Sequence, residues 1–198
     1  MENTRAKTTR NSLILLLTAT IWGMAFVSQS KGMDYMHPFT FNGVRSLIGA
    51  AGILVYILIS RKIAGDKAAK LDWKLNVRAG LLCGIFLTIA STLQQFGIKY
   101  TSVGKAGFIT TLYIIFVPMF GIFLKKKVAP VVWAAAGMAA VGMYLLCMTE
   151  SLRLGAGDIM VFLCAIAFAI QIMTVDHYAA RIDGAVVSFS QFTVCGVG

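Results

Sequence analysis

The chain has 198 residues, of which 58% are hydrophobic and 13% are charged, and its formal net charge is +10. Soluble domains average roughly 45–50% apolar and about 25% charged residues, so this composition predicts a membrane protein. The positive charge does not indicate a nucleic-acid partner, because the lysines and arginines cluster in short stretches between apolar segments.

Apolar stretches long enough to cross a bilayer as helices follow a polar, basic N-terminal segment, residues 1–11. The first of them could be a signal peptide, but it is too long for one and has no clear cleavage site. The predicted fold class is therefore all-α, a polytopic membrane helix bundle whose first partner is the lipid bilayer. We expect spans at residues 12–30, 38–60, 77–97, 102–124, 130–148 and 157–175, and a seventh that begins near residue 184.

The distribution of lysine and arginine predicts the orientation of the bundle. Thirteen of these residues lie in the N-terminal segment and the loops on the same side of the membrane, and three lie in the loops opposite. Since cytoplasmic loops carry the excess of positive charge, we expect a multi-pass protein of the cell membrane with a cytoplasmic N-terminus.

A weak internal repeat indicates how the spans are organised. An offset of 146 residues pairs residues 21–26 with residues 167–172 and Arg45 with Gln191. Five spans separate the two copies, so the second copy would enter the membrane from the opposite side. We predict a five-helix repeat over residues 12–148 and the start of an inverted second repeat over residues 155–198.

The fourth span follows a turn and contains a proline. Residues 100–112 combine a turn signal, hydroxyl groups and a lysine, and Pro118 lies about halfway along the span. Proline removes the donor that would pair with the carbonyl of Ile114, so we expect a helix kink at Pro118. The kink is compatible with a helix beside a cavity and equally with a plain lipid-facing helix.

Four stretches together resemble the EamA-type transporters of the drug/metabolite transporter superfamily. They are residues 16–27 (LLTATIWGMAFV), residues 38–45 (PFTFNGVR), residues 97–110 (GIKYTSVGKAGFIT) with Pro118 downstream, and Gly157-Asp158. The resemblance implies two inverted five-helix repeats and secondary transport of small metabolites, amino acids or drugs.

The chain departs from the family pattern in two places. The family usually has an acidic residue after its fourth helix, where this chain reads Lys125-Lys126-Lys127, so no carboxylate role is carried over. The seventh apolar stretch runs to the last residue, so we expect a truncated second repeat.

Polar side chains within spans are costly unless they face a partner or water, which makes them candidates for a substrate cavity. The candidates are Thr18, Trp22, Gln29, Asn42, Arg45, Gln94, Gln95, Lys105, Thr110, Tyr113 and Gln171.

Several of these candidates have structural alternatives. Gln29 could lie at the membrane interface, and Arg45 could extend its stem to the surface rather than bind a ligand. Lys105 could attract an anionic substrate or extend outward in the same way. The adjacent residues Gln94 and Gln95 cannot share one helix face, so at most one is expected to face a cavity and the other to bond a neighbouring helix.

No catalytic, nucleotide-binding or metal-ligand spacing occurs in the sequence. The carboxylates lie mostly in loops, none offers an evident proton-coupling site, and we expect no enzyme activity, cofactor or metal. The cysteines lie in apolar runs and are expected to be small buried hydrophobes: Cys83, Cys147, Cys164 and Cys195.

The leading hypothesis is a secondary transporter, acting by efflux or exchange of a small-molecule substrate through alternating access. The alternative is a truncated, non-transporting membrane protein that acts only by associating with a partner. That partner would be a second copy of the chain or the missing helices of the second repeat.

Overall fold

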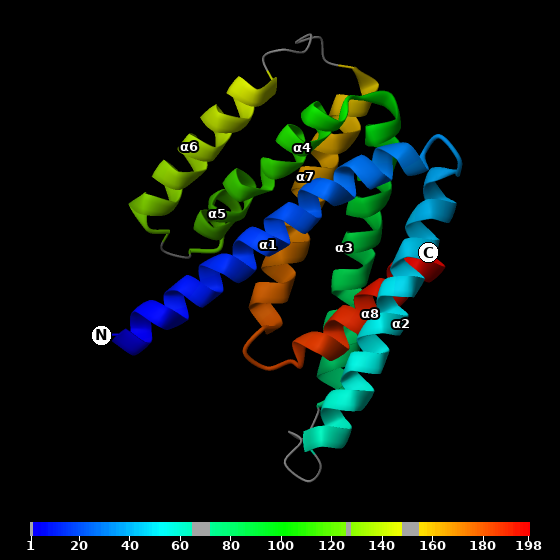
Figure 1. The fold of residues 1–198 in the computed structure, drawn as a ribbon, viewed down its shortest axis with the longest axis vertical. Coiled ribbons are helices and arrows are strands. Elements are labelled where there is room, and N and C mark those ends of the chain that lie inside the picture. The colour runs from blue at the N-terminus through cyan, green and yellow to red at the C-terminus, as the bar shows by residue number, and fades with distance from the viewer. Residues whose placement is uncertain (1, 65–71, 126–127, 148–154) are drawn as a thin grey trace.

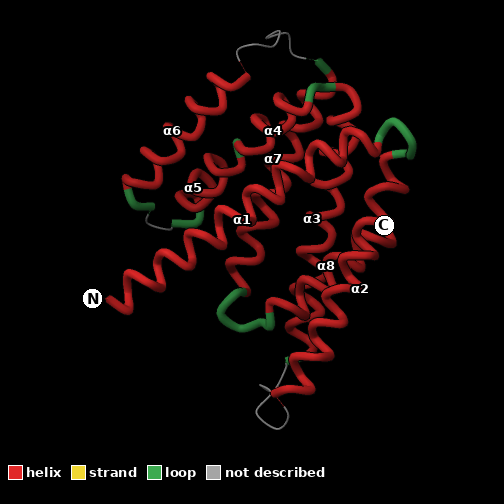
Figure 2. Tube along the Cα trace, in the orientation of Figure 1, coloured by secondary structure: helices red, strands yellow, loops and turns green. Residues whose placement is uncertain are grey.

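The structure, a computed structural model, describes residues 2–64, 72–125, 128–147 and 155–198; within them, the side chains of residues 2–7, 64, 139, 142–143 and 146–147 are not described. The described residues contain helices and no strand, which confirms the predicted all-α bundle (Figures 1 and 2). The helices are α1 (Glu2–Gly32), α2 (Pro38–Ala64), α3 (Trp73–Tyr100), α4 (Val103–Thr111), α5 (Tyr113–Phe123), α6 (Pro130–Cys147), α7 (Ala156–Tyr178) and α8 (Gly184–Val197).

Among the described residues, five stretches are long and apolar enough to cross a membrane. They are Thr8–Gly32, Pro38–Ile63, Trp73–Tyr100, Val103–Phe123 and Ala156–Tyr178. These correspond to five of the predicted spans. The spans predicted over α6, some of whose side chains are not described, and over the shorter α8 stay predictions.

Two helices extend beyond the expected membrane spans. The helix α1 begins at Glu2, so the polar N-terminal segment is helical and continuous with the first span. The helix α3 begins at Trp73 because the side chain of Asp72 accepts a hydrogen bond from the backbone N–H of Leu75 and caps the helix.

The helix α3 is the central element of the bundle. It contacts α1, α2, α4, α7 and α8 (Figure 1). In the most apolar stretch of each helix, 44% of the residues of α3 are buried inside the bundle, whereas none of those of α1 are buried. The central position follows from small residues along α3, since they let neighbouring backbones approach closely.

Glycines bring α8 against the first half of α3. Gly80 and Gly84 are one turn apart, and a methyl group added there would lie 2.3 Å from Ser190 and 2.7 Å from Val194 of α8. Only glycine therefore fits at these two positions without displacing α8.

A second glycine contact brings α7 against the end of α3. A methyl group on Gly157 would lie 2.7 Å from the backbone carbon of Tyr100, and one on Gly97 would lie 2.4 Å from Val161. The two backbones are thus in direct contact where α3 ends and α7 begins.

The fourth span is interrupted at Leu112, between α4 and α5, and the kink expected at Pro118 stays a prediction. The backbone N–H of Leu112 bonds the carbonyl of Ile109, which tightens the chain into a turn between α4 and α5. Pro118 lies buried inside α5. Because the proline ring disfavours helical geometry in the turn before it, near Ile114, the break comes earlier in the chain than the proline.

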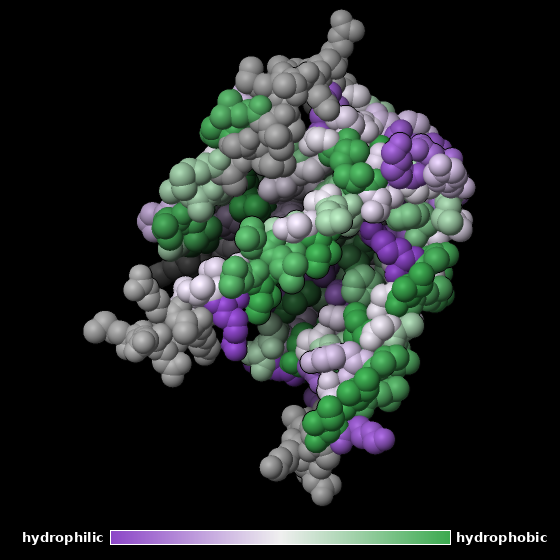
Figure 3. All heavy atoms as spheres, in the orientation of Figure 1, coloured by the Kyte–Doolittle hydropathy of each residue, from purple (hydrophilic) through white to green (hydrophobic). Residues whose placement is uncertain are grey.

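Large apolar side chains cover the outside of the bundle. Side chains of α1 from Leu13 to Leu17 and of α2 such as Val55 and Leu58 are exposed. In Figure 3, hydrophobic surface follows α2 toward its C-terminal end, and hydrophilic surface gathers near the turn between α1 and α2. In a bilayer these apolar side chains would contact lipid.

Candidate functional site

A layer of polar side chains lies where α1, α3 and α4 meet. We name Gln29, Gln94, Gln95 and Thr110 the polar layer; each is at most 5% exposed. The Nε2 atom of Gln94 donates to the hydroxyl of Thr110 on α4 at 3.3 Å. The Nε2 atom of Gln95 donates to the backbone carbonyl of Gln29 on α1 at 3.4 Å.

Both glutamines of α3 are buried, and each bonds a neighbouring helix, as was expected of one of them. They lie on different flanks of α3, so each reaches a different neighbouring helix. The carbonyl oxygens Oε1 of Gln29 and Gln95 have no hydrogen-bond partner among the described residues. A buried polar atom without a partner costs about 1–3 kcal/mol, so these atoms favour the arrival of a donor.

An apolar cluster lies beside the polar layer. Ile98 of α3, Ala106 and Ile109 of α4 and Val161 of α7 pack together and are buried, with Phe26 of α1 against them. Thr110 follows Ile109 directly on α4. Thr110 is thus buried next to the contact of α4 with α3 and α7.

At the end of the bundle, beyond the apolar cluster, Asp158 joins α7 to α4. We name Thr101, Lys105 and Asp158 the α4–α7 clasp. The Nζ atom of Lys105 lies 3.8 Å from Oδ2 of Asp158. The same oxygen accepts the backbone N–H of Gly155 at 2.9 Å, and Oδ1 accepts the hydroxyl of Thr101.

This clasp gives Asp158 and Lys105 structural contacts. The carboxylate of Asp158 is buried at the first turn of a membrane span. Its bond with the backbone N–H of Gly155, the residue before α7, is one half of a helix-capping box. Lys105 pairs with the same carboxylate, and the attraction of an anionic substrate by Lys105 stays a prediction.

Asn42 and Arg45 belong to a different cluster, between α2, α3 and α8. Asn42 donates to the hydroxyl of Ser91 at 2.9 Å, and Ser46 donates to the sulfur of Cys195 at 3.3 Å. Arg45 donates through Nη2 to Oδ1 of Asn42 at 3.1 Å. Arg45 thus forms a contact within its own helix, and Lys105 is not part of its cluster.

A cavity of about 390 Å³ adjoins this cluster. Its polar lining includes Asn42, Thr88 and Thr92. Cys195 also lines it and bonds neighbouring side chains, whereas Cys83 and Cys164 lie in apolar clusters as expected. The side chain of Cys147 lies outside the described residues.

The remaining candidates lie apart from the polar layer. Thr18 is exposed and donates to the carbonyl of Ile14, and Trp22 is 48% exposed. Gln171 of α7 donates to Gln191 of α8 at 3.0 Å. Tyr113 lines a cavity of about 540 Å³ between α5, α6 and α7.

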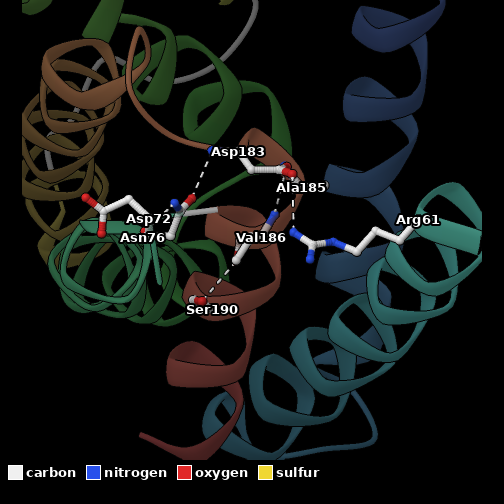
Figure 4. Close-up of polar contacts among 7 residues, drawn as sticks. All are labelled: Arg61, Asp72, Asn76, Asp183, Ala185, Val186 and Ser190. Carbon is white, nitrogen blue, oxygen red and sulfur yellow. Dashed lines mark hydrogen bonds and ion pairs between the residues drawn. The ribbon is translucent and has the colours of Figure 1, made fainter. Parts of the chain in front are cut away.

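The opposite end of α3 carries a second polar cluster, which sequence reasoning missed. We name Arg61, Asn76 and Asp183 the α3–α8 clasp (Figure 4). The buried Asn76 accepts the backbone N–H of Asp183 at 2.8 Å and donates to the carbonyl of Asp72 at 2.8 Å. The carboxylate of Asp183 caps α8 and lies 4.0 Å from Arg61 of α2.

The half of the bundle next to the α3–α8 clasp contains an open cavity. A cavity of about 640 Å³ lies between α3, α5 and α7. Its lining is mainly apolar and aromatic and includes Leu82, Phe86, Phe120, Met173, Thr174 and His177. Among the described residues, no group of three histidine, cysteine or acidic side chains is placed to hold a metal ion.

Comparison with known proteins gives two matches. Residues 10–148 match the EamA-like transporter family. An uncharacterized transporter from Archaeoglobus fulgidus is 29% identical over 183 residues, which cover 89% of this chain and 52% of the relative. The chain therefore spans about half the length of this curated relative, and no solved structure matches it significantly.

Proposed function

The chain belongs to the EamA-like transporter family, and on that premise we propose that it takes part in secondary transport of a small molecule across the cell membrane. The proposed mechanism is alternating access, with efflux or exchange of metabolites, amino acids or drugs. Rocking of two inverted repeats, residues 12–148 and the repeat that begins in residues 155–198, would expose a central site to each side in turn.

The observation that carries this proposal is the polar layer. Gln29 and Gln95 bury two carbonyl oxygens, between membrane helices, that have no partner in the described part of the chain. Such groups are costly in a bilayer and mark substrate pathways. Acceptors of this kind suit a substrate with N–H or O–H donors, such as an amine, an amide or a hydroxylated metabolite.

The transport test compares Gln95→Leu with the unsubstituted chain in vesicles loaded with labelled amino acids and amphiphiles. We expect at least a tenfold loss of flux at unchanged membrane abundance, because leucine removes both the donor and the acceptor. Thr18→Val is the matched control, since Thr18 is exposed and bonds only within α1 in the structure; its flux should be unchanged. Absence of flux for every compound, while a full-length relative transports some of them, would contradict the proposal.

The proposed orientation has a cytoplasmic N-terminus. Reporter fusions after Lys70 and after Lys127 should then give cytoplasmic signals, and a fusion after Arg153 an exterior signal. A cytoplasmic signal at Arg153 would contradict both the orientation and the inverted repeat. In this orientation the α4–α7 clasp faces the exterior, and the α3–α8 clasp faces the cytoplasm.

A second candidate function is association with a partner without transport by this chain alone. It is favoured by the uncovered apolar surface of α1 and by the match to about half of the relative. The partner would be a second copy or a chain that supplies further helices. Crosslinking in membranes tests this, and a chain found only as a monomer would rule it out.

A further inference from the structure

We propose that α4 is the outer gate of the transport pathway, hinged at Leu112 and held closed by the ion pair between Lys105 and Asp158. This inference rests on the proposed function and adds to it the segment that moves and the contact that must break.

The ion pair differs from the other two among the described residues by its burial. The side chains of Lys105 and Asp158 are 18% and 4% exposed, whereas those of Lys31 and Asp34 are 79% and 63% exposed. The pair between Arg61 and Asp183 is 44% exposed on both sides. A buried pair is screened less by water and salt than an exposed one, and removing one partner leaves the other charge buried, so breaking this pair should have the largest effect of the three.

The positions of the two charges make the pair a contact between helix ends. Lys105 and Asp158 are each the third residue of their helices, α4 and α7. The N-terminal end of a helix favours an anion and disfavours a cation, so Lys105 is poorly placed unless a carboxylate lies beside it. Asp158 offsets that cost while α4 lies against α7.

The contact of α4 with α7 covers the Thr110 side of the polar layer. Ala106 and Ile109 of α4 pack on Val161 of α7, and Thr110 comes next on α4. Moving the start of α4 away from α7 would open this apolar cluster and expose Thr110 to the exterior.

The chain has a hinge on one side of this contact and a fixed support on the other. Leu112 is the single turn residue between α4 and α5, and the proposed gate would bend there. The end of α3 and the start of α7 are held by the backbone contact of Gly97 with Gly157. With the α4–α7 clasp formed, the structure shows the proposed gate in its closed position.

The test measures how fast an impermeant thiol reagent, added from outside, labels the reporter Thr110→Cys in membranes. The unsubstituted chain, which keeps all four native cysteines, gives the background rate; among the described side chains, Cys83, Cys164 and Cys195 are buried. Adding Lys105→Met to the reporter should speed labelling at least fivefold, because the ion pair is lost. Lys105→Arg should keep labelling slow, and Asp34→Asn, which removes the exposed pair at the same end, should leave it unchanged. An unchanged rate with Lys105→Met would overturn the gate.

A second reporter separates gate opening from general loosening of the bundle. Thr174→Cys lines the cavity in the cytoplasmic half and is labelled from the cytoplasmic side. With Lys105→Met its rate should be unchanged or lower, and a faster rate at both reporters would overturn the proposal. If Lys105→Met does not accumulate, Asp158→Asn removes the charge while keeping the shape, with the same expected results.

Labelling requires no substrate, so the two proposals can fail separately. Absence of flux contradicts the proposed function, whereas unchanged labelling of the Thr110→Cys reporter contradicts the gate.

Discussion

The two ends of α3 are held by clasps of similar composition but different burial. Each combines a basic residue, an aspartate in the cap of a following helix, and one further polar side chain. In the α4–α7 clasp the charged pair itself is buried. In the α3–α8 clasp the charged pair is half-exposed, and the buried member is the amide of Asn76. The same residue types therefore stabilise the two ends through different groups.

The difference follows from how closely the backbones approach. Gly97 and Gly157 bring the start of α7 onto the end of α3, so the carboxylate of Asp158 is enclosed. Asp183 follows a turn after α7 and keeps an exposed carboxylate, while its backbone N–H is bonded by Asn76. We therefore expect that removing one partner of a buried contact destabilises the bundle more than removing one partner of an exposed contact.

Asp158→Ala is expected to give the largest effect. It removes the acceptor of Thr101 and of the Gly155 N–H and takes from Lys105 the carboxylate with which it pairs. We expect a loss of about 3–5 kcal/mol in the free energy of unfolding, measured by denaturing-detergent titration in mixed micelles. Asp34→Ala, at an exposed pair, should change it by at most about 0.5 kcal/mol. Similar losses for both variants would contradict the importance of burial.

Gly157→Ala tests the backbone contact that encloses Asp158. The added methyl would lie 2.7 Å from the backbone of Tyr100, which cannot rotate away as a side chain can. We expect a loss of about 1–3 kcal/mol in the same titration. Gly23→Ala is the control, because no atom lies within 4 Å of the added methyl; it should stabilise α1 slightly, as alanine does in helix interiors. Equal stability of both variants would show that α3 and α7 can separate without cost.

Asn76→Ala tests the buried member of the α3–α8 clasp. It leaves the Asp183 N–H and the Asp72 carbonyl without the partners they have in the structure. We expect a loss of about 1–2 kcal/mol in the free energy of unfolding. Faster amide hydrogen exchange should be confined to the start of α8. Exchange that rises throughout the bundle would contradict a local role.

Arg61→Ala should have the smallest effect. The pair with Asp183 is 4.0 Å long and half-exposed, so we expect at most about 0.5 kcal/mol at low salt and no difference at high salt. A loss comparable to that of Asp158→Ala would remove the distinction between the two clasps.

In the polar layer, residue types alone identified the members but not how they group together. Gln29, Gln94, Gln95 and Thr110 were all candidates because polar groups within spans are costly. Their grouping could not be predicted, since it depends on which flank of α3 meets α1 and which meets α4. Thr18 and Trp22 were candidates from the same span as Gln29, and helical periodicity places them on the same helix face, yet their part of α1 is exposed. Periodicity identifies a face of a helix but not the neighbour that covers it.

The sequence by itself determined that this is an all-α membrane protein, where most of its spans lie, and which transporter family it belongs to, because composition, span length and local motifs are properties of neighbouring residues. Only the tertiary structure decided that Lys105 pairs with Asp158 and that Arg45 bonds Asn42. It also decided that the fourth span breaks at Leu112. Contacts such as that of Lys105 with Asp158 join residues from distant parts of the chain, and their formation depends on how closely the glycine-bearing backbones of α3, α7 and α8 approach.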